Sequence, residues 1–117
     1  MSQDAVVDTV RSMSSGIVGR TLNSARTNHF VLDSPSGPGE AVSNGEAFLS
    51  GISSCGFTLI EAYAQQNNVP VKRMHVMIDG VLRPPNMAQF EAVNINFELF
   101  GVSQGQAEEL VQVWRDR

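Results

Sequence analysis

The feature that most constrains the fold is one long segment, residues 45–61, which has the pattern of a helix with almost no charge. It contains no basic residue, and its only acidic residues, Glu46 and Glu61, lie at its two ends. A helix that is apolar on most of its sides belongs in the interior of a protein rather than on its surface. The segment also carries Cys55, the only cysteine of the chain. This thiol is either an inert small hydrophobic group or the reactive atom of the protein.

Local signals predict both ends of this helix. Ser43 is a favourable N-cap, and Glu46 follows three residues later, which completes the pattern of a capping box. Pro70 predicts that the helix stops near residues 66–68, because the residue before a proline is pushed toward an extended conformation. Apolar residues recur at steps of three or four, so one face holds Phe48, Ile52, Cys55 and Leu59.

The rest of the chain predicts strands and a second helix. Apolar and polar residues alternate in the later strands, which indicates antiparallel pairing with one solvated face. Ser103 and Gln106 repeat the capping-box pattern at the start of the second helix. Small residues at 51, 54 and 56 of the first helix favour close approach of another backbone. Four strands are expected, at residues 17–24, 27–33, 71–83 and 90–100. The first two are expected to join near Ser24-Ala25. Residues 1–15 fit a short helix or a strand equally well.

Length, charge and cysteine content limit the classes of function. The 117 residues suit one domain, residues 1–117, with one core. Twelve acidic and eight basic residues give a net charge of −4, and no basic run with aromatic residues indicates a nucleic-acid partner. A single cysteine excludes an internal disulfide. The longest uncharged stretch, residues 47–60, is too short and too polar to span a bilayer, so we expect a cytoplasmic protein without a membrane partner.

Several short motifs, in this order and spacing, resemble the OsmC/Ohr family. Residues 26–35 read RTNHFVLDSP and resemble the family's R-x-x-H-x-x-x-D-x-P strand. A Gly-rich loop follows, and then a helix in which Glu46 precedes Cys55 by nine residues. The N-x-V-P-V entry at residues 67–71 and the S-x-x-Q-A-E-E-L helix continue the likeness, which covers about residues 17–116.

The resemblance implies an α+β fold with an antiparallel sheet, a long buried central helix and a second, shorter helix. It also implies an intertwined homodimer with the central helices in its core. The implied activity is thiol-dependent reduction of organic hydroperoxides in the peroxide stress response. In the family, a helix cysteine attacks the peroxide and becomes a sulfenic acid, and a second cysteine condenses with it to a disulfide. An external dithiol reduces that disulfide, and an Arg and a Glu assist the first cysteine.

The family's residues can be assigned to this chain only in part. Cys55 matches the first cysteine, and Glu46 matches the acid of the OsmC-like branch. Arg26 is the best match for the assisting arginine, with Arg20 as a competitor. The second cysteine is absent, because the chain ends at Arg117, where the segment that carries it begins in the family. The resemblance therefore implies a one-cysteine route that uses an external thiol or dithiol as reductant and no cofactor or metal.

Each of these residues also has a purely structural interpretation. Glu46 is explained by the capping box alone, Arg26 as a solvated strand residue, and Cys55 as a buried thiol. A free thiol has a pKa of about 8.5, so a reactive thiolate at neutral pH needs a cation close by. His29 is a weaker candidate partner for Cys55, and His75 falls on the polar face of its strand. The alternative function is a non-catalytic dimer of the same fold that binds a small apolar ligand or a protein partner.

Overall fold

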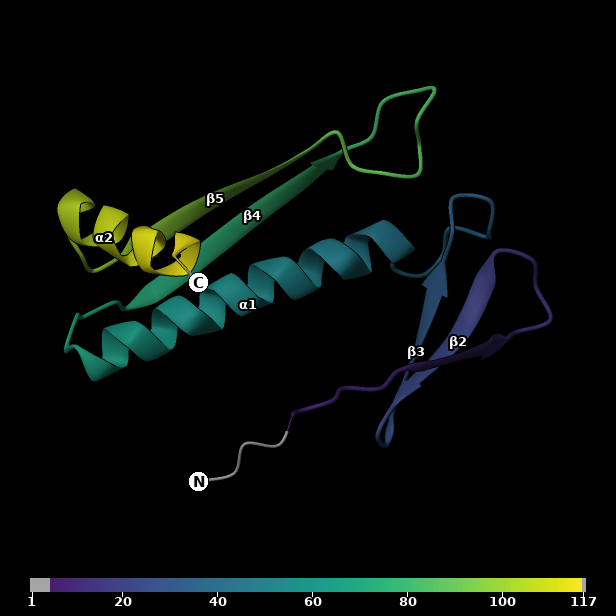
Figure 1. The fold of residues 1–117 in the computed structure, drawn as a ribbon, viewed down its shortest axis with the longest axis horizontal. Helices are drawn as coiled ribbons and strands as arrows, with labels where there is room; N and C mark the ends of the chain where they lie inside the picture. Colours follow the sequence, from purple (N-terminus) through teal and green to yellow (C-terminus); the bar gives the residue numbers. More distant parts are fainter. Residues whose placement is uncertain (1–4, 117) are drawn as a thin grey trace. The chain divides into compact units, whose positions relative to one another are not determined.

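In the computed structural model, the described part of the chain is residues 5–116, which contain five strands and two helices. The chain divides into two compact units, residues 1–47 and 48–117. The α+β class is confirmed, with one strand more than the sequence predicts (Figure 1). The elements are β1 (Arg11–Ser14), β2 (Arg20–Ala25), β3 (Asn28–Asp33), α1 (Asn44–Gln66), β4 (Arg73–Val81), β5 (Ala92–Phe100) and α2 (Gln104–Arg115).

The first unit is built on a three-stranded antiparallel sheet in the order β1-β2-β3. The register places Met13 opposite Leu22 and Leu22 opposite Val31, so one apolar row crosses all three strands. These side chains are 65%, 40% and 37% exposed, respectively. The buried residues among those described in this unit, Asn23 and Asp33, are both polar. The described residues of the first unit therefore form no hydrophobic core of their own.

The predicted positions of the first strands are partly wrong. Residues 17–19 lie in the β1–β2 connection, where Gly19 has a φ of 88° and the Arg20 amide donates to the Ile17 carbonyl at 3.2 Å. The turn between β2 and β3 falls at Arg26-Thr27 rather than at Ser24-Ala25. Residues 11–14 form a strand, although their sequence, RSMS, shows no apolar alternation. Pairing with β2 decides their conformation.

The second unit is organised around the β4–β5 hairpin. The two strands pair antiparallel from Arg73↔Phe100 to Val81↔Ala92, close to the predicted segments. One face of the hairpin packs against the side of α1 that carries Ile60 and Ala64 (Figure 1). Leu110 from α2 completes this core with Met74 from β4. The partly buried residues packed around it are Phe57, Tyr63, Val69, Val71, Val76, Phe97, Leu99, Val111 and Trp114.

Both helix-end predictions for α1 are confirmed. The Ser43 amide donates to Glu46 Oε1 at 2.9 Å, and the Glu46 amide donates to Ser43 Oγ at 3.0 Å, which is a complete capping box. At the C-terminus Asn68 is left-handed, with a φ of 56°. The Val69 amide donates to the Ala64 carbonyl at 2.9 Å, and the Asn68 amide donates to the Gln65 carbonyl. These two bonds form a Schellman motif, and Pro70 follows it.

The side of α1 that the second unit buries holds Gly56, Ile60 and Ala64. Gly56 admits a side chain rather than a backbone, because a Cβ there would lie 2.9 Å from Trp114 Nε1. The Trp114 ring packs in turn on Phe97, with centroids 5.3 Å apart. Cys55 lies outside this buried side and is exposed. The two sides of the helix therefore differ in environment although residues 47–60 carry no charge on either side.

Gly56→Ala is expected to destabilise the protein by about 1–3 kcal/mol, because the added methyl group displaces Trp114 from its packed position. The control is Gly105→Ala in α2, where the nearest atom to an added Cβ lies 3.9 Å away. That change is expected to stabilise by up to about 1 kcal/mol through helix propensity. Urea unfolding followed by tryptophan fluorescence measures both. Equal effects of the two changes would contradict the packing described for Trp114.

Candidate functional site

Cys55 lies in the middle of α1, in the second unit, and its thiol is solvent-exposed. Its neighbours on the exposed surface of the helix are small and uncharged, with Gly51, Ser54 and Thr58 one turn away or less. Thr58 Oγ1 donates to the Ser54 carbonyl at 3.0 Å, so this hydroxyl is engaged with the helix backbone. The Cys55 thiol is therefore accessible to solvent, which contradicts its interpretation as a buried thiol.

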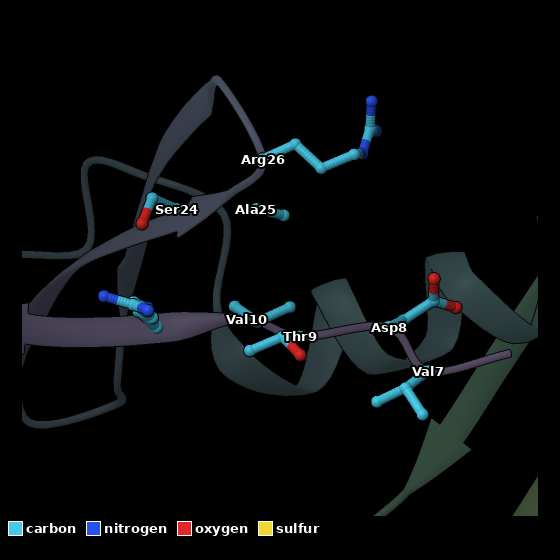
Figure 2. Close-up of a pocket in the computed structure, with 8 residues that line it drawn as sticks. Val7, Asp8, Thr9, Val10, Ser24, Ala25 and Arg26 are labelled. Carbon is cyan, nitrogen blue, oxygen red and sulfur yellow. The ribbon is translucent and has the colours of Figure 1, made fainter.

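Arg26 lies at the turn between β2 and β3 in the first unit. Its φ of 58° is uncommon for a residue with a side chain. The side chain is exposed and extends from the turn, beside a hollow of about 800 Å³ (Figure 2). The hollow is lined by residues 7–11 and 24–26. Within residues 5–116 no ion pair engages Arg26, so its guanidinium is available to a ligand or another chain.

Arg20, the competing arginine, is held by an ion pair. Its Nε and Nη2 atoms donate to the two oxygens of Asp33 at 2.7 and 2.9 Å, and Nη2 also donates to Glu40 at 3.3 Å. Asp33 is 1% exposed and also accepts from the amides of Glu40 and Ala41, at 2.8 and 2.9 Å. Asp33 thus ties the loop before α1 to the start of β2.

This network shifts the pKa values of Asp33 and Arg20 in the directions that favour their charged forms. The Arg20 hydrogen bond lowers the pKa of Asp33 far below its usual value, and the two backbone amides add to this effect while burial opposes it. The Asp33 hydrogen bond in turn raises the pKa of Arg20. The sequence pattern does not reveal this pairing, because it depends on the register that places Arg20 opposite Asp33 on two adjacent strands.

Glu46 occupies the first turn of α1, where its carboxylate closes the capping box with Ser43. Its structural role is therefore to cap the N-terminus of α1. Arg26 and Glu46 belong to the first unit and Cys55 to the second. No ion pair joins Arg26 to Glu46 within the described residues. The arginine that does pair with acidic side chains in the first unit is Arg20, which contacts Asp33 and Glu40.

The histidines and acids do not gather into a metal site. Between residues 5 and 116, no group of three or more His, Cys, Asp or Glu side chains is arranged to hold a metal ion. His75 is exposed and lies edge-on to Phe100, with ring centroids 5.6 Å apart. His29 is exposed on β3. Over the same residues, neither helix has the length and apolar character needed to cross a membrane.

Solved structures with this fold include proteins named OsmC and Ohr. The OsmC organic hydroperoxide resistance protein from Legionella pneumophila matches with a TM-score of 0.77 at 17% identity, covering 97% of this chain and 85% of that one. The organic hydroperoxide resistance protein from Elizabethkingia anophelis matches with a TM-score of 0.78 at 11% identity, covering 98% and 85%. OhrB of Bacillus subtilis matches with a TM-score of 0.68 at 13% identity, covering 95% and 84%.

These similarities define the chain as a protein with the OsmC-like fold, as the sequence motifs predict. No protein-family model matches the sequence, and no curated protein matches it either. At such low identity the likeness carries the fold and not the chemistry. The functional assignment therefore depends on the residues of the chain itself.

Asp33→Asn is expected to lower the denaturation midpoint more than Glu91→Gln does. The first change disrupts a buried ion pair, whereas the second weakens the exposed Arg83–Glu91 pair. Because the pKa of Asp33 is depressed in the folded state, its contribution is complete above the unfolded value of about 3.9 and is lost as the pH falls. The gap between wild type and Asp33→Asn is therefore expected to narrow below about pH 3.9. Thermal unfolding at pH 7 and pH 2.5 measures this difference in unfolding midpoint between wild type and Asp33→Asn. A difference that does not change with pH would contradict the ion pair.

Proposed function

We propose that this protein is an OsmC-like thiol peroxidase that reduces organic hydroperoxides through Cys55 alone. The observation that carries the proposal is an exposed thiol in the middle of the nearly uncharged helix of an OsmC-like fold. Three of the solved structures with this fold are named organic hydroperoxide resistance proteins. An accessible cysteine without a disulfide partner suits chemistry that begins with attack on a small oxidant.

The cycle needs no second cysteine in the chain. The Cys55 thiolate attacks one peroxide oxygen, the O–O bond breaks, and the alkoxide leaves as an alcohol after taking a proton. Cys55 is then a sulfenic acid. An external thiol condenses with it, releasing water and forming a mixed disulfide, and a second external thiol restores Cys55 and releases an external disulfide.

Arg26 is proposed to stabilise the Cys55 thiolate, and Glu46 to orient that guanidinium. Arg26 is supported over Arg20 because no ion pair engages Arg26 within residues 5–116, whereas Arg20 is paired with Asp33 and Glu40. One carboxylate oxygen of Glu46 closes the helix cap, so the other is the candidate partner for the arginine. A thiolate at neutral pH requires such a cation.

A homodimer is proposed to cover the apolar surfaces that a single chain exposes. The Met13–Leu22–Val31 row is exposed on a sheet whose described residues bury no apolar side chain, and Phe48 at the start of α1 is 59% exposed. Exposed apolar patches of this kind mark interfaces between proteins. A second copy of the chain presents the same surfaces and is the simplest cover.

Cumene hydroperoxide is expected to oxidise wild-type protein at Cys55, and Cys55→Ser is expected to abolish the reaction. Arg26→Gln is expected to slow the oxidation by about tenfold or more, because it removes the charge that stabilises the thiolate. The matched control is Arg11→Gln, another exposed arginine of the first unit. Mass spectrometry of quenched samples measures the rate. Unchanged peroxide consumption in Cys55→Ser would overturn the proposed function, whereas slowing in Arg20→Gln alone would reassign the arginine.

The wild-type protein is expected to sediment as a dimer at micromolar concentration. Leu22→Glu places a charge within the exposed apolar row and is expected to shift the equilibrium toward monomer. Asn94→Glu, on an exposed residue of β5, serves as the control. Analytical ultracentrifugation measures all three proteins. A monomeric wild type would contradict the proposed dimer and leave the peroxidase chemistry to be tested separately.

A further inference from the structure

The outer edge of β5 is open along its length. In the described part of the chain, residues 5–116, β5 pairs only with β4, in a two-stranded sheet. In an antiparallel ladder, alternate residues direct their N–H and C=O groups away from the partner strand. The outer edge of β5 is therefore a row of backbone groups to which a further extended segment can hydrogen-bond.

A groove of about 600 Å³ follows this edge. Residues 95–99 of β5 form one of its walls. Because consecutive residues of a strand point to opposite faces of the sheet, five consecutive lining residues place the groove along the edge rather than on one face. The other wall is a stripe of α2 made of Gln104, Ala107, Glu108, Val111, Gln112 and Arg115.

β5 lacks the features that commonly keep an exposed edge from pairing. Such edges are short, interrupted by a bulge, or marked by proline or lysine. The nine residues of β5, AVNINFELF, contain neither proline nor lysine, and their register with β4 is unbroken from Arg73↔Phe100 to Val81↔Ala92. By contrast, the edge strand β1 has four residues. The edge of β5 is thus suited to pairing with another segment.

α2 runs antiparallel to β5 along the groove. β5 ends at Phe100 and α2 begins at Gln104, whereas the Trp114 ring packs on Phe97 with centroids 5.3 Å apart. The start of α2 therefore lies near the end of β5, and Arg115 lies near the middle of the strand. A segment antiparallel to β5 would run in the same direction as α2.

The centre of the helical wall is apolar. Ala107 and Val111 are partly buried, and Val111 packs against the core of the second unit, as do Phe97 and Leu99 of β5. Alternate side chains of an inserted strand would point toward this wall. An apolar side chain in the middle of such a strand would be removed from water against Ala107 and Val111.

Two opposite charges flank this apolar centre. Glu108 and Arg115 are exposed, and no ion pair engages either of them within residues 5–116. They are seven residues apart, so they lie on one side of α2, about 10 Å apart along its axis. Glu108 accepts from Gln104 Nε2 at 3.2 Å, and Asp116, beside Arg115, accepts from Gln112 Nε2 at 2.9 Å. The wall therefore favours a cation at Glu108 and an anion at Arg115.

A segment that has no sheet of its own fits this edge better than β5 of a second copy. Symmetric pairing of two β5 strands would bring both α2 helices to the same face of the joined sheet. Paired strands lie about 4.8 Å apart, whereas packed helices need about 8–10 Å. The two helices would therefore compete for the space over the junction between the copies.

We propose that the edge of β5 binds an extended peptide segment of another protein, in which an acidic residue follows a basic one by four positions. The segment pairs antiparallel with β5, so it meets Glu108 before Arg115. Four residues of a strand span about 13 Å, which places the basic side chain at Glu108 and the acidic one at Arg115. The side chain midway between them is apolar and lies on Ala107 and Val111. Backbone pairing supplies affinity, and the two charges select the sequence and its direction.

The probe is a capped heptapeptide, Thr-Lys-Thr-Val-Thr-Glu-Thr, and the control peptide has the same composition with lysine and glutamate exchanged. Both are titrated into the full chain and followed by amide chemical shifts. The probe is expected to bind about tenfold more tightly than the control peptide, because the exchange replaces two attractive pairs by two repulsive ones. The largest shifts are expected at residues 95–99.

A double variant tests the charges of the wall. Glu108→Arg combined with Arg115→Glu exchanges the two charges and is expected to reverse the preference, so that the control peptide binds more tightly. Glu109→Arg changes an exposed residue of α2 outside the groove and is expected to leave the preference unchanged.

Backbone pairing is tested with two N-methylated versions of the probe. One carries the methyl group on the amide of its valine, and the other on the amides of the two adjacent threonines. Since only alternate amides of a paired strand point toward its neighbour, one version is expected to lose binding and the other to retain it.

The proposal would be overturned by an absence of shifts at about 1 mM probe, by equal affinity for the two peptides, or by a preference that the double variant does not reverse. Binding by both N-methylated versions would also overturn it. So would edge amides of β5 that exchange slowly with solvent in the free protein and exchange faster on dilution, since a second copy would then occupy the edge. The test involves no step at Cys55, so its outcome is independent of the proposed peroxidase chemistry.

Discussion

The second unit depends on the packing of one nearly uncharged helix against one hairpin. Ile60 and Ala64 of α1 meet Met74 of β4 and Leu110 of α2, and these four residues are its buried hydrophobic core. Gly56 allows Trp114 to close over the helix. Because this side of α1 is the covered one, the thiol of Cys55 is left on an exposed side of the same helix. The core packing thereby determines which chemistry the chain can present to solvent.

The first unit is stabilised in a different way. Its sheet buries Asn23 and Asp33 rather than apolar residues, and its apolar row faces outward. The Asn23 side chain accepts a hydrogen bond from Ser12 Oγ at 2.6 Å and donates one to Thr21 Oγ1 at 3.0 Å. Asp33 accepts from Arg20 and from two backbone amides. Polar networks of this kind specify geometry but supply little net stability. A partner surface that covers the apolar row would provide what the unit lacks.

Local rules predicted the helix ends and the later strands, because each depends on a few neighbouring residues. The Ser43–Glu46 and Ser103–Gln106 capping boxes form as expected. The pattern did not reveal β1, since its conformation comes from pairing with β2. It also did not reveal which side of α1 is buried, because apolar residues recur at steps of three or four on more than one side of this nearly uncharged helix. The Arg20–Asp33 pair depends on strand register, which the sequence does not display. The roles of Cys55, Arg26 and Glu46 remain predictions.

The most direct test of the central claim compares Cys55 with an ordinary thiol. Cumene hydroperoxide is mixed with the protein at pH 7, the sulfenic acid is trapped with dimedone, and the rate is compared with that of glutathione under the same conditions. If the fold activates Cys55, the protein is expected to react at least about a hundredfold faster than glutathione, in line with the effect of a well-placed charge, and to form one sulfenic acid per chain. A rate equal to that of glutathione would mean that Cys55 is exposed but not activated, and that this OsmC-like chain is not a peroxidase.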